Sequence, residues 1–291
     1  MKFLETPSMQ SSFIHKSVFG LHKAISCPRS ALSWIVRGHS SKDRLFVSQT
    51  YWFSGTLPRV PLNAILPSLE EVDVVLPRAF DRRSAASESA NITVEEASHL
   101  AAIANYTKAT KVLEIGTADG NTALLLAANI EAGGTVVTVD LPLDFEMAKQ
   151  DSLTYPEGEL NLTSREEVGR QYRGQRLSHC ITQVYGDSAK LNWNELGGPF
   201  DLVFIDGCHS EAYVRSDSQN ALKHLAARGA IVWHDYGMIP EVSSIVDQLA
   251  RESPTIEVYA LEGTRLAVGL KPGIRGSVLG GRAGSTVTVR K

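Results

Sequence analysis

The chain has 291 residues, of which 43% are hydrophobic and 21% charged, and its formal net charge is -3. This composition is that of a globular protein of one large domain or one domain with an extension, and it lacks the basic excess of a nucleic-acid-binding protein. Three cysteines, Cys27, Cys180 and Cys208, lie far apart and form no CxxC pair. Their spacing argues against a zinc cluster and favours a reducing, cytoplasmic compartment. No apolar run approaches the length of a membrane-spanning helix.

The first 90 residues differ from the rest and predict an N-terminal extension. Residues 1–44 are basic and poor in acids, and four apolar residues recur at helical spacing: Ile14, Val18, Leu21 and Ile25. This segment has three interpretations: a helix that contacts a membrane or partner peripherally, an accessory helix packed on the main domain, or a loosely ordered arm. Residues 45–80 contain four prolines and predict an irregular connector with a strand or two, and residues 82–91 predict a polar loop.

Regular structure is predicted from residue 93 onward. Helices are expected at residues 93–106, 122–130, 164–172, 210–227 and 240–252. Strands are expected at residues 111–115, 134–139, 181–185, 201–205 and 229–233, with a closing pair at residues 256–261 and 265–270. The first and third of these helices begin with a capping box, in which Ser or Thr precedes Glu by three residues.

This alternation predicts an α/β fold. We expect a Rossmann-like, mostly parallel sheet of seven strands with helices on both faces. The closing pair of strands is a hairpin, which makes the last strand antiparallel. The domain is expected to span residues 91–271. Residues 272–291 are rich in Gly and Arg and predict a disordered tail.

The loop after the first strand of this domain reads VLEIGTADGNT and begins at Val112. Ligands of an open parallel sheet bind beyond the carboxyl ends of its strands, so this loop is the expected binding site. Gly116 and Gly120 let the backbone approach a ligand closely and turn into the next helix. Asp140 follows about 20 residues later, where a carboxylate can accept both hydroxyls of a ribose.

The same loop argues against two common nucleotide sites. It lacks the GxGxxG of a dinucleotide site, because Ala118 stands at the second glycine position, and no lysine follows Gly120 as a P-loop requires. The loop therefore favours a ribose-bearing ligand without phosphates. Glu114 and Asp119 would suit a positively charged ligand, such as an adenosine with a sulfonium and an amino acid tail.

Together these motifs resemble class I S-adenosylmethionine-dependent methyltransferases over about residues 93–271. VLEIGTADGNT is similar to the first motif of that family, and FDLVFIDGCHS and GAIVWHDYG are similar to its fourth and fifth strands. Asp140 matches the ribose-binding acid, and Asp187 matches the acid that meets the adenine amino group. The resemblance implies S-adenosylmethionine as the cofactor. It implies cofactor contacts by Glu114, Gly116, Thr117, Gly120, Asp140, Asp187 and Asp206.

Acidic residues also end two neighbouring strands of the predicted sheet. Asp206 ends the fourth strand and Asp235 follows the fifth, and adjacent strands lie about 4.8 Å apart. Two such carboxylates can reach one oxygen-preferring ion, Mg²⁺ or Ca²⁺. His209 lies three residues after Asp206, so its ring can point at the same space. Asp206 could instead only cap the helix that follows.

These residues resemble those of metal-assisted O-methyltransferases of the catechol and sugar types. The resemblance implies Asp206 and Asp235 as metal ligands and His209 as the catalytic base, with Asp206 beside it. The chain departs from the family at His234-Asp235-Tyr236, where two carboxylates or an Asp-Asn pair would stand. A hydrogen-bonded relay of His234, Asp235 and His209 without a metal is therefore the alternative.

We expect an S-adenosylmethionine-dependent methyltransferase that acts on a hydroxyl of a small or sugar-like acceptor. The extension, the 82–91 loop and a 141–163 insert would surround that acceptor. Two other interpretations stay open: a cofactor-binding scaffold without catalysis, and a nicotinamide-dependent oxidoreductase. The missing GxGxxG argues against the oxidoreductase, and the retained Asp206, His209 and Asp235 argue against the scaffold. Neither the acceptor nor the oligomeric state follows from the sequence.

Overall fold

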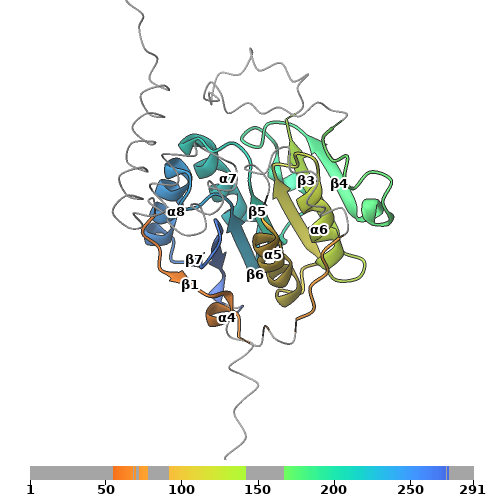
Figure 1. The fold of residues 1–291 in the computed structure, drawn as a ribbon. Coiled ribbons are helices and arrows are strands. Elements are labelled where there is room, and N and C mark those ends of the chain that lie inside the picture. The colour runs from red at the N-terminus through yellow and green to blue at the C-terminus, as the bar shows by residue number, and fades with distance from the viewer. Residues whose placement is uncertain are drawn as a thin grey trace, which may run out of the picture.

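The computed structural model describes residues 55–67, 69, 72–77, 92–141, 167–272 and 274. Within them, one eight-stranded sheet has the order β1-β7-β8-β6-β5-β2-β3-β4 (Figure 1). The strands are β1 (Arg59–Val60), β2 (Lys111–Ile115), β3 (Thr135–Asp140), β4 (Ile181–Tyr185), β5 (Phe200–Ile205), β6 (Leu225–Trp233), β7 (Glu257–Leu261) and β8 (Ala267–Leu270). The helices are α4 (Leu62–Ile65), α5 (Val94–Tyr106), α6 (Asn121–Asn129), α7 (Glu211–His224) and α8 (Pro240–Glu252), with 3-10 turns η4 (Arg176–Cys180) and η5 (Trp193–Leu196).

The predicted Rossmann-like architecture is confirmed. Strands β4, β3, β2, β5 and β6 pair in parallel, and β8 is antiparallel to both β6 and β7. The central strands carry side chains to two separate cores. One core lies under α5 and α6, and the other lies under α7 and α8. Leu202 and Val203 face opposite cores, as successive residues of a strand must.

The structure differs from the sequence-based expectation in three elements. The helix expected at residues 164–172 is absent from its described part, where residues 167–174 form hydrogen-bonded turns. Gly169 is the reason, because its positive φ of 72° interrupts a helix. The helix expected at 210–227 ends at His224, because Leu225 already pairs with Phe200 of β5. The sheet has eight strands instead of seven.

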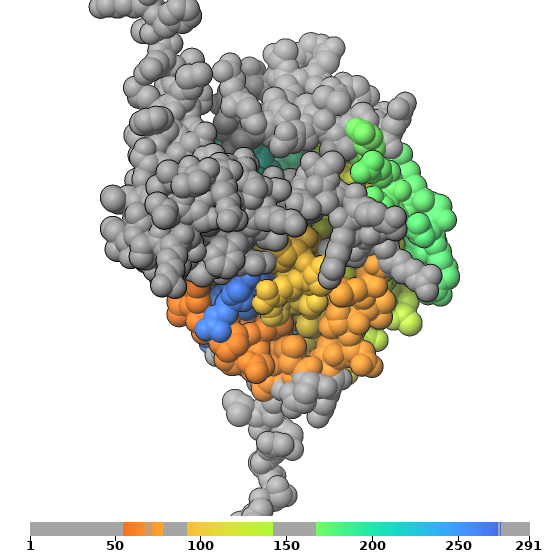
Figure 2. Space-filling view, in the orientation of Figure 1, coloured from red at the N-terminus to blue at the C-terminus, as the bar shows by residue number. Residues whose placement is uncertain are grey.

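The eighth strand comes from the predicted N-terminal extension. β1 pairs in parallel with β7, and Arg59 donates hydrogen bonds to two carbonyls of the β7–β8 hairpin. α4 adds Leu62 and Ile65 to the core under α5. In Figure 2 this segment, in orange, lies against α5 and the blue C-terminal residues. The described part of the extension is therefore packed on the main domain.

Several predictions concern segments outside the described residues. These are the basic arm, the 82–91 loop, residues 142–163 of the insert and the tail from residue 275 onward. Over the ranges that the structure covers, no helix has the length and hydropathy needed to cross a membrane.

Candidate active site

The register of the central strands aligns three chain segments at the carboxyl edge of the sheet. Ile115 at the end of β2 pairs with Ile205 of β5, and Ile205 pairs with Trp233 of β6. Gly116, Asp206 and His234 therefore follow in one row. The sequence analysis expected Asp235 to stand opposite Asp206, but by register that residue is His234, and Asp235 lies one position further.

Gly116 is needed for a close approach between two strand ends. Its φ is 98°, and a Cβ there would lie 2.1 Å from the carbonyl oxygen of Asp206. No side chain fits at that distance. The glycine thus brings the cofactor loop after β2 against the residues that follow β5, and the predicted cofactor and acceptor residues meet at one place.

Glu114 points into a fully buried space next to this loop. Its Oε2 accepts a hydrogen bond from Thr138, whereas its Oε1 is buried with no hydrogen-bond partner among the described residues. Burial raises the pKa of Glu114 well above its usual value, and nearby Asp206, Asp140 and Asp119 add to the shift. A buried carboxyl group with a vacant acceptor oxygen suits a cationic ligand.

Asp140 and Thr117 shape the same loop. Asp140 accepts hydrogen bonds from the backbone N–H groups of Ala118 (2.7 Å) and Leu141 (2.6 Å). Thr117 is buried and its hydroxyl lies 2.6 Å from that of Thr138. Ala118 adopts a φ of 45°, which is uncommon for a residue other than glycine. Asp140 therefore holds the loop in an unusual backbone conformation at the expected ribose position.

Asp187 lies in a separate buried group with two residues of α7. It accepts hydrogen bonds from the backbone of Ala189 and from the hydroxyl of Tyr213. Asp217, one helical turn further along α7, is fully buried, and neither of its carboxylate oxygens has a hydrogen-bond partner among the described residues. Burial, assisted by Asp187, raises the pKa of Asp217 to about 7.

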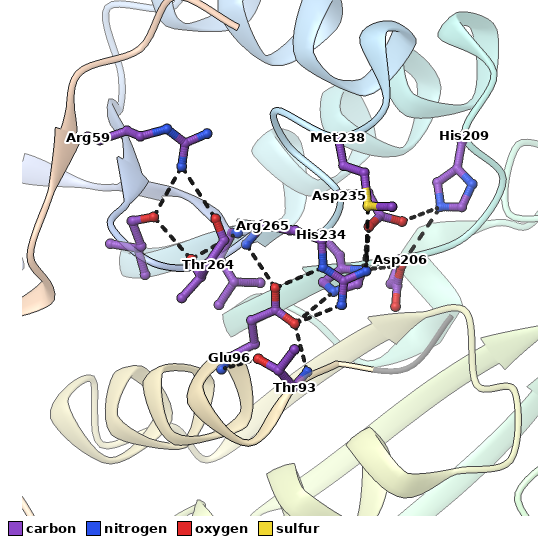
Figure 3. Close-up of polar contacts among 12 residues, drawn as sticks. Arg59, Thr93, Glu96, Asp206, His209, His234, Asp235, Met238, Thr264 and Arg265 are labelled. Carbon is purple, nitrogen blue, oxygen red and sulfur yellow. Dashed lines mark hydrogen bonds and ion pairs between the residues drawn. The ribbon is translucent and has the colours of Figure 1, made fainter. Parts of the chain in front are cut away.

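The residues predicted for the acceptor side form a compact group of ionisable side chains. His209 Nε2 lies 3.4 Å from Asp235 Oδ2 and 3.9 Å from Asp206 Oδ1. His234 Nδ1 lies 3.0 Å from Asp206 Oδ1 and 3.5 Å from Asp235 Oδ1 (Figure 3). The structure brings together all the acceptor-side residues that the sequence analysis singled out. The capping alternative for Asp206 is wrong, because the N-cap of α7 is Ser210.

Two further charged residues complete this group, and the sequence analysis missed both. Arg265, in the β7–β8 hairpin, donates to Asp235 Oδ1 at 3.0 Å and to Glu96 Oε2 at 2.9 Å. Glu96, in the first turn of α5, also lies 3.4 Å from His234 Nε2. Two signals in the sequence could have marked them. Arg265 is a charged residue beside an otherwise apolar strand, and Glu96 is a capping glutamate followed by an apolar helix.

The ionisable side chains of this group shift one another's pKa values. Burial disfavours every charged form, but the neighbouring carboxylates outweigh it and raise the pKa of His234 well above its usual value. Burial likewise opposes ionisation of Asp206 and Asp235, yet the facing His234 lowers the pKa of both. Glu96, Asp206 and Asp235 thus lie around His234 and Arg265, and Asp206 and Asp235 also lie beside His209.

Asp206, His209 and Asp235 also have the chemistry of a metal-ligand set. One ligand atom from each lies within 4.8 Å of the others. Two carboxylates and an imidazole fit a divalent cation, and Asp235 Oδ2 is turned away from Arg265 toward His209.

Comparison with known proteins agrees with this geometry. The model of a family described as "Methyltransferase domain" matches residues 113–236, which include the glycine loop and the ends of β5 and β6. No curated protein matches the chain significantly. The match makes residues 113–236 similar to that family.

Solved structures of similar fold include three that resemble the chain over most of its length. The O-methyltransferase TomG of Streptomyces achromogenes, solved with SAM, is 16% identical, with 72% of this chain and 96% of that chain covered and a TM-score of 0.51. SAH-bound PaMTH1 of Podospora anserina is 16% identical, with 75% and 99% covered and a TM-score of 0.52. An O-methyltransferase of Bacillus cereus with SAH is 17% identical, with 72% and 97% covered and a TM-score of 0.50. These structures, all below 25% identity, share the fold that the resemblance to class I S-adenosylmethionine-dependent methyltransferases implied.

Proposed function

We propose that this protein transfers the methyl group of S-adenosylmethionine to a hydroxyl oxygen of a small acceptor, with His209 as the general base. The observation that carries the proposal is the position of the His209 imidazole. Its Nε2 lies 3.4 Å from Asp235 and 3.9 Å from Asp206, beside the loop expected to hold the cofactor. A base at that place is within reach of an acceptor facing the sulfonium.

The reaction is an in-line displacement. The acceptor oxygen forms a bond to the methyl carbon while the bond between that carbon and sulfur breaks, and its electron pair stays on sulfur as a neutral thioether. The hydroxyl proton passes to the imidazole of His209. Asp206 and Asp235 lie beside the imidazolium that results, so their carboxylates stabilise the product of proton transfer.

The cofactor would lie along the glycine loop. Glu114 would face its positively charged end, because the buried Oε1 of this residue is a vacant acceptor. Asp140 would accept the ribose hydroxyls at the end of β3, beside Gly116, Thr117 and Gly120. Asp187 would lie near the adenine, and Asp206 would border both the cofactor and the acceptor. The SAM- and SAH-bound structures of similar fold support this cofactor.

A divalent ion is the second form of the same proposal, and the donor set of Asp206, His209 and Asp235 favours it. Those three residues would hold Mg²⁺, which would lower the pKa of a hydroxyl bound to it. In that form His209 is a ligand and another base accepts the proton. The two forms are separated by assay after chelation. Transfer that survives EDTA supports the base, and transfer restored only by Mg²⁺ supports the ion.

Calorimetry tests the activity class before any acceptor is known. We expect heat on titration with S-adenosylmethionine and none with NAD, because Ala118 occupies a position that a dinucleotide site keeps as glycine. Binding of NAD alone would reject the proposal in favour of an oxidoreductase. Binding of S-adenosylmethionine without transfer to any member of a panel of catechols, phenols and glycosides would favour a scaffold. The cytoplasmic location and the sugar-like acceptor stay predictions.

A further inference from the structure

We infer that Arg265 is a positioning residue for the reaction, which holds the Asp235 carboxylate toward His209, and that Glu96 fixes the orientation of Arg265. The inference rests on the proposed role of His209. Neither residue touches the expected path of the methyl group. Their effect reaches the reaction through Asp235.

Arg265 holds the residues after β6 at two points. Its guanidinium donates to Asp235 Oδ1 at 3.0 Å, and its backbone carbonyl accepts the N–H of Tyr236 at 2.9 Å. The two oxygens of the Asp235 carboxylate therefore have different neighbours. Oδ1 faces Arg265, which leaves Oδ2 toward His209 at 3.4 Å.

Asp235 needs such a support because of its backbone. Its φ is 56°, in the left-handed region that side chains other than glycine adopt rarely. Residues in this region persist when the surrounding contacts hold them there, and they concentrate at functional sites. A standard extended backbone at Asp235 would direct the carboxylate elsewhere. The contact with Arg265 thus selects the conformation that the base requires.

Glu96 in turn holds Arg265. Its Oε1 accepts from the backbone N–H and from Nε of Arg265, at 2.8 and 3.0 Å, and its Oε2 accepts from Nη2 at 2.9 Å. Oε2 also accepts from the backbone of Thr93, as part of the capping box of α5. The guanidinium is therefore fixed by a bidentate pair, and Nη1 is left pointing at Asp235 (Figure 3). Both residues are almost fully buried.

This arrangement predicts that the rate of methyl transfer depends on the shape of the Arg265 guanidinium as well as on its charge. A lysine keeps the charge but cannot contact Glu96 in two places and Asp235 at once. Arg265→Lys should therefore lower kcat about 10- to 100-fold, while the Kd for S-adenosylmethionine changes less than about twofold. Glu96→Gln should also lower kcat, but by a smaller factor than Arg265→Lys. The double variant Glu96→Gln/Arg265→Lys should be no slower than Arg265→Lys, because both residues act through one contact.

The experiment compares these variants with Arg59→Lys as a matched control. Arg59 also contacts the β7–β8 hairpin, through the carbonyls of Leu261 and Thr264, and its guanidinium lies 5.9 Å from the centroid of the Tyr236 ring instead of on the Asp235 carboxylate. Tritiated S-adenosylmethionine is used with the panel of catechols, phenols and glycosides, and melting temperatures are recorded in parallel. We expect Arg59→Lys to lower the melting temperature and leave kcat unchanged. An equal fall of kcat in Arg59→Lys, or an unchanged kcat in Arg265→Lys, overturns the inference.

A His209→Asn background separates this inference from the proposed function. If His209 is the base and Arg265 acts through Asp235, Arg265→Lys should have no further effect on kcat in that background. A normal rate in His209→Asn alone rejects the proposed base instead. Should Arg265→Lys not fold, the charge-neutral pair Glu96→Gln/Arg265→Gln replaces it. A crystal structure of that pair with Asp235 still at positive φ and still facing His209 also overturns the inference.

Discussion

At the carboxyl edge of the sheet, the proposed cofactor side and the proposed acceptor side both bury carboxyl groups, but their neighbours shift the pKa values of those groups in opposite directions. On the cofactor side, Glu114 faces neutral and acidic neighbours, and burial raises its pKa. On the acceptor side, Asp206 and Asp235 are also withdrawn from water, yet the His234 imidazole outweighs burial and lowers their pKa values. The neighbouring groups therefore decide in which direction the pKa of a buried acid is shifted here.

The largest expected effect on this contrast comes from removing the base of the acceptor side. His209→Asn should lower kcat by about 10²- to 10⁴-fold, the usual contribution of a general base. Affinity for S-adenosylmethionine should stay within about twofold, because the cofactor-side acids are untouched. Cys208→Ala is the neighbouring control, since its thiol donates to the Ser210 hydroxyl at 3.5 Å. A rate in His209→Asn close to that of the unmodified protein would contradict the assignment.

The proposed cofactor side can be tested by measuring whether Glu114 loses a proton when S-adenosylmethionine binds. Because burial raises the pKa of Glu114 well above its usual value, a positively charged ligand bound beside it should lower that pKa again, and binding should release protons. Titrations in buffers of different ionisation enthalpy measure that release, and affinity should rise with pH. Glu114→Gln should abolish the release and weaken binding about tenfold, the cost of a lost charged contact. Binding without proton release in the unmodified protein would count against a protonated Glu114.

The buried carboxyl group of Asp217 should make the free energy of unfolding depend on pH. The folded protein keeps this acid protonated up to about pH 7, whereas its unperturbed pKa is 3.8. Between these values the folded state binds more protons than the unfolded state, so the contribution of Asp217 to stability falls as pH rises and stays low above pH 7. Asp217→Asn should therefore raise the free energy of unfolding by about 1–3 kcal/mol at pH 8. At about pH 4 the gain should vanish in urea titrations, and an equal gain at both pH values would contradict this reading.

The smallest expected effect concerns the contact that joins the N-terminal extension to the acceptor side. The Tyr236 hydroxyl donates to Asp247 at 2.6 Å and accepts from the backbone N–H of Leu57 at 2.9 Å. Tyr236→Phe should cost about 1 kcal/mol and lower the melting temperature by about 2–4 °C. Tyr259→Phe removes a more exposed hydroxyl bonded to Glu257 and should change the melting temperature less. Equal shifts in the two variants would contradict the role assigned to Tyr236.

The order of the elements was predictable from the sequence because local patterns determine them. The capping box at Thr93 and Glu96 predicted the start of α5, and the structure contains both of its hydrogen bonds. The glycine loop and the two strand-end acids predicted where the site lies. Each of these signals spans only a few neighbouring residues.

The remaining features depend on contacts between distant parts of the chain. Glu96 binds Arg265 across 169 positions, and no local pattern marks such a pair. Strand register brings His234 opposite Asp206, a shift of one residue that alternation alone does not fix. β1 is two residues long and forms only because β7 offers a free edge.

The most direct test of the account is methyl transfer from tritiated S-adenosylmethionine to the hydroxyl panel in the presence of EDTA, with and without His209→Asn. We predict a methyl ether formed in equal amount with S-adenosylhomocysteine, unaffected by EDTA and nearly absent in the variant. Undiminished transfer by His209→Asn, or transfer to nitrogen or carbon instead of oxygen, would contradict it.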